Sequence, residues 1–426
     1  MSIKRRLVTG IATTAILLNT LTPMVFADTT LTISGNGADS DNEIEVKTTQ
    51  SVQVQQSNDA DVHNFVNADA STGGNEADRN TGGDVKIDTG NANSTVNVGN
   101  TLNSNSADVD CNTCGGDVTA KISGNGEDSD NEIELGGWKS ENGVSILQTN
   151  DADVHNYVNA DAKTGGNEAE RNTGGKVTIN TGNAKSDVTV STVANANSAT
   201  VGGSSDGSSI EAIISGNGAD SDNEIELDPR NSISIWQAND ADVHNRVYAD
   251  AKTGYNEAER NTGGDVKIDT GDATAKVKVN NKVNFNYADA DCCELSITAK
   301  ISGNGEDSDN EIEAKNLSSE IVIAQGGWTK VGHKWLKLGN DADLHNYVGA
   351  DAKTGKNEVE KTTGVPDDPD EIWTGNAISD VTVTNTANKN VFGADPEWEM
   401  PDFSGINLEL NFSLGDLLGF LGFHLG

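Results

Sequence analysis

A 12-residue string occurs four times in the chain, and this internal repetition constrains the fold more than any other feature. It reads SGNGADSDNEIE or SGNGEDSDNEIE and begins at residues 34, 123, 215 and 302, at intervals of 89, 92 and 87 residues. A second string, NDADVHN or NDADLHN, follows each copy at residues 58, 150, 239 and 340. Such repeats are typical of architectures in which each unit packs on its neighbours. The chain therefore divides into four repeats and a tail, which are residues 28–120, 121–212, 213–299, 300–394 and 395–426.

Apolar and polar residues alternate within each copy with a period of two. In the first copy, Val62 and Val66 fall on one side of an extended chain, and Asp61 and His63 fall on the other. This alternation predicts strands with one buried face. TGG triplets at 72 and 81 and a TG pair at 89 mark glycine corners between the strands. The pattern predicts an all-β fold, a β-solenoid (β-helix-like) of four tandem repeats of about 90 residues, with Asn and Thr ladders along its axis.

Tandem β-sandwich modules are the alternative fold, because 90 residues is close to the size of an immunoglobulin-like domain. Such modules would bury an aromatic residue in each copy. Trp138, Trp236 and Trp328 follow the acidic string in copies two to four, whereas copy one has no Trp at this place. Both folds stay open at this point.

The first 27 residues predict a secretory signal peptide. Lys4, Arg5 and Arg6 precede a short apolar stretch, and Val25 and Ala27 occupy the positions that a signal peptidase reads. Removal of residues 1–27 would take the formal charge from −38 to −41, because three positive charges and no negative ones are lost. We therefore expect a secreted or cell-surface protein without a transmembrane helix in its mature chain. So acidic a chain disfavours nucleic acid as a partner and favours calcium.

The repeated phrases resemble those of secreted Asn/Gly/Thr-rich tandem-repeat surface proteins of uncultured bacteria. The resemblance rests on the NTGG, TGNA and SGNGA phrases and extends from residue 31 to about residue 390. It implies secretion and a repeat architecture rather than an activity. The chain is also similar to curli-type amyloid subunits in being a secreted acidic β repeat, but it lacks their shorter period.

The acidic string offers candidate calcium ligands. It is not an EF-hand, because Ile44 stands where that loop requires Gly. A looser site could combine backbone carbonyls of the GNG turn with three carboxylates from each copy. The candidate ligands are Asp39, Asp41, Glu43, Asp128, Asp130, Glu132, Asp220, Asp222, Glu224, Asp307, Asp309 and Glu311. The alternative is a glycine-cornered turn that leads into a strand with outward acids, which protect an edge against aggregation.

The second string places two carboxylates and one imidazole on one face of a strand. Asp59, Asp61 and His63 are a plausible set for a transition metal. Successive side chains on one strand face lie about 6.5 Å apart, however, so the three cannot reach one ion together. We therefore expect one His in each copy to stack on the next as a ladder of partly exposed imidazoles.

Four cysteines in an exported chain suggest disulfide bonds. Two repeats of a solenoid would separate Cys114 from Cys293 by many rungs, which is too far for a bond. Local bonds, Cys111–Cys114 and Cys292–Cys293, or bonds to a second molecule are then the expected arrangements.

No catalytic motif of the hydrolase, zincin or P-loop type occurs in the chain. The sequence predicts a non-enzymatic structural or adhesive repeat protein, a surface or matrix component stabilised by calcium. The alternative is a carbohydrate-active β-helix enzyme, a polysaccharide lyase or hydrolase. A groove along the coil with clustered Arg, Lys and aromatic residues would favour it. The apolar end of residues 395–426 could cap the solenoid or serve in self-association.

Overall fold

The structure is a computed structural model that describes residues 10–11, 29–47, 50–109, 117–136, 142–202, 209–228, 230–291, 296–315, 318–331, 334–364 and 369–393. Its described secondary structure consists of strands in four successive coils of similar length. The expected bonds at Cys111, Cys114, Cys292 and Cys293, and the tail 395–426, lie outside the described residues, as does the expected leader apart from β1 (Gly10–Ile11).

Each coil repeats the same order of strands. Coil 1 comprises β2 (Thr29–Ser34), β3 (Asp41–Val46), β4 (Gln50–Ser71), β5 (Glu76–Asp78), β6 (Val85–Asp88) and β7 (Ala92–Val109). Coil 2 comprises β8 (Val118–Ser123), β9 (Asp130–Gly136), β10 (Asn142–Lys163), β11 (Glu168–Glu170), β12 (Val177–Thr181) and β13 (Ala184–Gly202). Coil 3 comprises β14 (Ser209–Ser215), β15 (Asp222–Asp228), β16 (Arg230–Lys252), β17 (Glu257–Glu259), β18 (Val266–Thr270) and β19 (Ala273–Asp291). Coil 4 comprises β20 (Ser296–Ser302), β21 (Asp309–Ala314), β22 (Ser318–Ala324), β23 (Gly327–Val331), β24 (Lys334–Lys353), β25 (Glu358–Glu360), β26 (Glu371–Thr374) and β27 (Ala377–Phe392).

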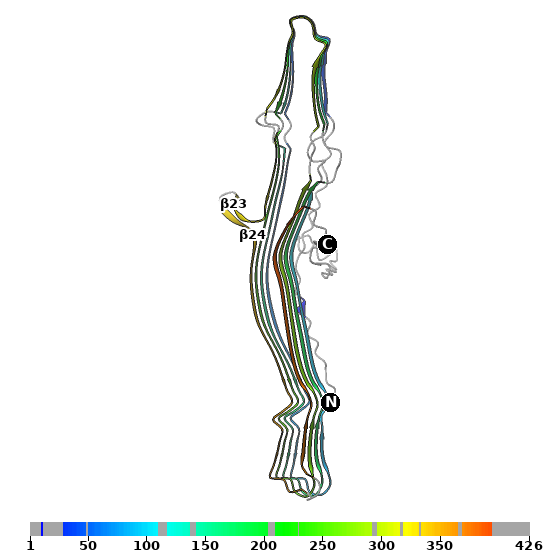
Figure 1. Cartoon of the computed structure of the whole chain (residues 1–426), viewed down its shortest axis with the longest axis vertical. Coiled ribbons are helices and arrows are strands. Elements are labelled where there is room, and N and C mark those ends of the chain that lie inside the picture. The colour runs from blue at the N-terminus through cyan, green and yellow to red at the C-terminus, as the bar shows by residue number, and fades with distance from the viewer. Residues whose placement is uncertain are drawn as a thin grey trace, which may run out of the picture.

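Equivalent strands of the four coils pair in parallel, in register, to form six sheets. The two longest sheets have the order β4-β10-β16-β24 and β7-β13-β19-β27. Residues with the same place in the repeat are paired directly, so that Asp59, Asp151, Asp240 and Asp341 stand side by side. The long strands run along the length of the molecule, and a hairpin of β23 and β24 projects from one side (Figure 1). The β-solenoid prediction is confirmed.

The two long sheets face each other across the core because every second side chain points inward. Val66, Val158 and Val247 from one sheet pack with Val98, Val190 and other small residues of the opposite sheet. Small β-branched residues and alanine fill this narrow layer, which explains why few aromatic residues are needed.

Polar ladders interrupt the apolar core. The Asn64 amide nitrogen donates to Oδ1 of Asn156 at 2.8 Å, and Asn156 donates to Asn245 at 2.8 Å. Asn64 also reaches across the core to Oδ1 of Asn100 at 2.8 Å. Since buried amides are stable only when they are hydrogen-bonded, each ladder favours the in-register stack. The expectation of asparagine ladders is confirmed.

Three expectations need correction. Each repeat is one coil and does not contain many rungs, because Val109 pairs with Val201 of the next repeat. Copies one and three are therefore only two steps of about 4.8 Å apart. The two long strands of each coil, with 16 to 23 residues, also run well beyond the eight- or nine-residue spacing of the glycine corners, and β4 has 22 residues. The sandwich alternative is wrong, because the strands of each copy pair with other copies, and Trp328 is 67% exposed rather than buried.

Candidate cation-binding and ligand-binding surfaces

The acidic string forms a corner between two strands in every coil. Asp39 lies at the corner between β2 and β3 with a φ of 57°, and Asp128, Asp220 and Asp307 repeat this left-handed conformation. Asp and Asn tolerate such a backbone better than most other residues. The string therefore combines a turn residue with the start of a strand.

Beyond the corner, the acids point outward and the intervening residues point inward. In β3, Asp41 and Glu43 are exposed, whereas Asn42 and Ile44 are buried. The geometry agrees with the interpretation of a corner that leads into a strand with outward acids. The same positions in β9, β15 and β21 form columns, so carboxylates meet between coils.

An asparagine pair under the corner holds the corner to the strand. Asn125 donates to Oδ1 of Asn131 at 2.7 Å, and Asn131 donates to Asn223 of the next coil at 3.1 Å. The equivalent side chains repeat this arrangement in coil 3. This support fixes the direction in which the following acids point.

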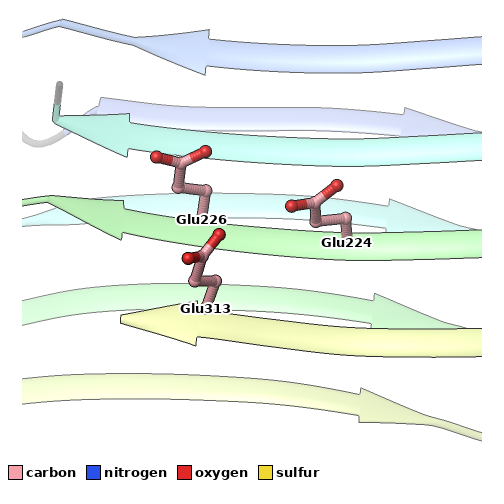
Figure 2. A group of neighbouring side chains, drawn as sticks. All are labelled: Glu224, Glu226 and Glu313. Atoms are coloured by element: carbon pink, nitrogen blue, oxygen red, sulfur yellow. The ribbon is translucent and has the colours of Figure 1, made fainter. Parts of the chain in front are cut away.

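Among the described residues, only three glutamates from two coils bring three side-chain ligand oxygens to within 4.8 Å of one another. Glu224 and Glu226 come from β15, and Glu313 comes from β21, where it pairs with Glu226 (Figure 2). One ligand oxygen of each lies within 4.8 Å of the others. The sequence prediction included Glu224 but not the other two.

Lys315 occupies the edge of this glutamate group. Its Nζ lies 3.1 Å from Oε1 of Glu226 and 2.6 Å from Oε2 of Glu313. These hydrogen bonds raise the pKa of Lys315. A metal ion at the glutamate group would therefore compete with a bound ammonium group.

Stacking of carboxyl groups between coils disfavours the ionised form of the glutamates in the inner coils. Burial raises the pKa of Glu224, and the neighbouring carboxylates of Glu311 and Glu226 raise it further. The pKa of Glu132 is raised by burial and then by Glu224 and Glu43, which are its column neighbours. Cations would relieve this repulsion, which is the electrostatic reason to expect them here.

The second string forms an aspartate groove on the outer face of the sheet that contains β4. Two adjacent columns line an open groove of about 560 Å³, and their members are Asp59, Asp61, Asp151, Asp153, Asp240, Asp242, Asp341 and Asp343. Burial raises the pKa of Asp151, followed by the effects of Asp240 and Asp59. The groove concentrates negative charge from all four coils.

A histidine ladder runs beside the aspartate groove. The rings of His63 and His155 stack at 4.8 Å, those of His155 and His244 at 4.9 Å, and those of His244 and His345 at 4.6 Å. Each Nε2 lies 2.8 to 2.9 Å from the aspartate two residues earlier in its own strand. The expected ladder of imidazoles is confirmed. Each imidazole contacts the aspartate at the position of Asp61 in its own coil.

An aromatic patch adjoins the histidine ladder. Tyr157, Tyr248 and Tyr347 line a hollow of about 340 Å³ together with Arg246 and His244. The guanidinium carbon of Arg246 lies 5.8 Å from the ring centre of Tyr248. Phe65 extends the patch into coil 1, with its ring centre 6.2 Å from that of Tyr157. Exposed rings beside a guanidinium are suited to stacking with a flat or sugar-like ligand.

Sequence reasoning missed Glu226, Glu313, Lys315 and the aromatic patch, because each arises between coils. Aligning the four copies position by position would have placed Glu226 beside Glu313, and Arg246 at the position of Tyr157 and Tyr347. The missing information was that one repeat makes one coil.

Comparisons with family models, with curated proteins and with solved structures found no match to this chain. Among the described residues, the search for a helix long and apolar enough to cross a membrane found none.

Proposed function

We propose that the protein is a secreted or cell-surface structural repeat protein with an adhesive face, stabilised by calcium. The observation that supports this proposal is the in-register stack, which presents each outward side chain of one coil beside its equivalents in the next. Such a surface suits repeated contacts along an extended partner or matrix. The expected signal peptide in residues 1–27 supports export.

Calcium is the cation that these surfaces fit best, because carboxylate oxygens are its preferred ligands and it accepts irregular geometry. Ions between coils would screen the columns and would stabilise the folded state by mass action. We therefore expect calcium to raise the thermal midpoint of residues 28–426, when sodium chloride is used to match ionic strength. Calorimetric titration with calcium chloride provides the direct test. A calcium response no larger than that of sodium would contradict this part of the proposal.

Two sets of variants separate the candidate calcium sites. The corner set changes aspartates to Asn, which tolerates the left-handed corner, at Asp39, Asp41, Asp128, Asp130, Asp220, Asp222, Asp307 and Asp309. The groove set changes Asp59, Asp151, Asp240 and Asp341 to Asn. Whichever set loses the calcium response identifies the binding surface, and retention of the full response in both sets would place binding elsewhere.

Lys315→Gln is a matched test of the glutamate group. It removes the ammonium that contacts Glu226 and Glu313 but keeps a side chain of similar length. We expect tighter calcium binding in this variant, because no bound ammonium then competes for the carboxylates. Lys86→Gln, which removes a contact to Asp88 on another sheet, is the control. Unchanged affinity after Lys315→Gln would exclude the glutamate group as a calcium site.

The aromatic patch favours a second candidate function, which is the carbohydrate-active enzyme. Arg246 and three tyrosines lie together next to carboxylates of the aspartate groove. Incubation of residues 28–426 with a panel of soluble polysaccharides distinguishes the two functions. Binding that is lost in Tyr157→Ala and Tyr347→Ala, without release of reducing ends or unsaturated products, would support adhesion. Turnover that is lost in the same variants would support the enzyme.

A further inference from the structure

The two ends of the stack are complementary to each other. In coil 4, core residues lose the cover that the next coil gives elsewhere, so Ile312, Val381 and Val383 are 48%, 44% and 41% exposed. In coil 1, Ile44 remains only 5% exposed. An uncovered apolar ledge therefore exists at the coil 4 end.

The asparagine ladder that begins at Asn75 has a direction that distinguishes the two ends of the stack. The amide nitrogen of Asn75 donates to Oδ1 of Asn167 at 2.9 Å, Asn167 donates to Asn256 at 2.8 Å, and Asn256 donates to Asn357 at 2.8 Å. The backbone N–H of each of the first three residues also donates to the same acceptor. Within the described residues, the ladder therefore ends with donors at Asn357 and with an acceptor at Asn75. Donors at one end match an acceptor at the other, whereas two identical ends do not match.

Glycines at the corners show the same directionality. A Cβ on Gly73, Gly165 or Gly254 would lie 1.9, 1.7 and 1.7 Å from the carbonyl oxygen of the next coil's glycine. At Gly355, the equivalent residue of coil 4, a Cβ would meet nothing within 4 Å. Coil 4 thus keeps the glycine that a fifth coil would require, although no contact among the described residues needs it.

The coil 1 end shows the converse. A Cβ on Gly126, Gly218 or Gly305 would lie 2.3, 2.4 and 2.3 Å from a backbone nitrogen of the preceding coil. At Gly37, the equivalent residue of coil 1, a Cβ would meet nothing within 4 Å. Both ends therefore have the backbone that close stacking on another coil demands.

We propose that copies of this chain associate head to tail, with the coil 4 end of one copy pairing in register with the coil 1 end of the next. The interface continues the parallel pairing that already joins coils 1 to 4. Because the two contacting ends differ, the contact is heterologous and generates an open filament. Each copy would advance the filament by four steps of about 4.8 Å, or about 19 Å. This assembly goes beyond the proposed function, which a single copy could perform.

Charge sets the condition for assembly. Head-to-tail pairing would bring Asp341 of one copy beside Asp59 of the next and would extend every acidic column. Assembly should therefore be weak at low ionic strength and strong in about 1 M sodium chloride, where the Debye length is about 3 Å. The expected leader contains β1, which pairs with β7 at the coil 1 end, so the mature chain is the appropriate sample.

The test uses residues 28–426 and two single substitutions that act at opposite ends. Gly355→Ala should leave the monomer intact but place a methyl group against Gly73 of the next copy, and Gly37→Ala should do the same at the other end. Gly99→Ser is the control, because Gly99 is exposed on an outer face and its column already contains Ser191, Asn280 and Thr384. Sedimentation and electron microscopy in about 1 M sodium chloride measure assembly, and circular dichroism verifies folding.

We expect filaments from the unmodified chain and from Gly99→Ser, and monomers from each of the other two variants alone. Mixing Gly355→Ala with Gly37→Ala should yield a 1:1 dimer and nothing larger, because only one compatible pair of ends remains. An unmodified chain that stays monomeric in both salt conditions would overturn the proposal. Filaments from both blocking variants, or a folded mixture without the dimer, would overturn it as well.

Discussion

Coil 3 and coil 4 carry equivalent residues in different environments. Val279 and Ile225 of coil 3 are fully buried, whereas their partners in coil 4, Val383 and Ile312, are 41% and 48% exposed. The difference arises because coil 3 has a neighbour on each side, whereas coil 4 has only one neighbour among the described strands. In this fold, burial is a property of the position in the stack rather than of the residue.

The largest contrast is expected when the same side chain is truncated in each coil. Ile225→Ala removes a fully buried side chain and should lower the free energy of unfolding by about 2–5 kcal/mol. Ile312→Ala should cost about 1 kcal/mol, because roughly half of the side chain is already in water. Denaturant unfolding of the monomer at low salt measures both. Equal losses in the two variants would contradict the comparison.

Corner glycines provide the second contrast. A Cβ at Gly165 would lie 1.7 Å from the carbonyl oxygen of Gly254, so Gly165→Ala must move one coil away from the next. We expect a loss of about 1–3 kcal/mol, as for other overpacked sites. Gly355→Ala should leave the stability of the monomer unchanged. Thermal unfolding at low salt distinguishes them, and a Gly165→Ala protein with an unchanged midpoint would refute the close packing.

Asparagine ladders provide the third contrast. Asn156 is fully buried and exchanges hydrogen bonds with Asn64, Asn100 and Asn245. Asn156→Ala removes these hydrogen bonds at a place that water does not reach, which should lower the free energy of unfolding by about 1–3 kcal/mol. Asn346→Ala at the coil 4 end should cost less, because solvent can replace the lost amide. The prediction fails if the two variants are equally destabilised.

The smallest expected effect concerns pH. Burial and then the column neighbours raise the pKa of Asp151 above its usual value of 3.8, so the charged form of Asp151 destabilises the folded state. This penalty is absent below pH 3.8, and it develops as the pH rises through the raised pKa of the folded state. Asp151→Asn should therefore raise the thermal midpoint at pH 7 by a few degrees and should have no effect at pH 3. A shift of equal size at both pH values would assign the effect to something other than charge.

Much of the fold follows from local sequence. The alternation around Val62 and Val66 predicts strands, because neighbouring side chains of an extended chain point to opposite sides. The glycines of the GNG turn predict a corner before the strand, and the structure has one at Asp39. The stacking of His63 on His155 also follows from the repeat, once a solenoid is assumed.

The candidate sites could be predicted only in part. The sequence predicts Asp41 and Glu43 as outward acids, but the glutamate group of the structure joins Glu224 and Glu226 to Glu313 of another coil. No spacing within one string reveals that contact. Lys315 was missed for the same reason, because its partners lie in two adjacent strands.

The sequence by itself determined that the chain is a fourfold repeat of strands with one apolar face and one acidic face. Only the tertiary structure decided that one whole repeat makes one coil, and hence that identical residues lie about 4.8 Å apart. The physical reason is that alternation specifies which way a side chain points but not how far a strand continues before it turns. That length is chosen by the in-register ladders and close glycine corners, which form only when entire repeats are superimposed.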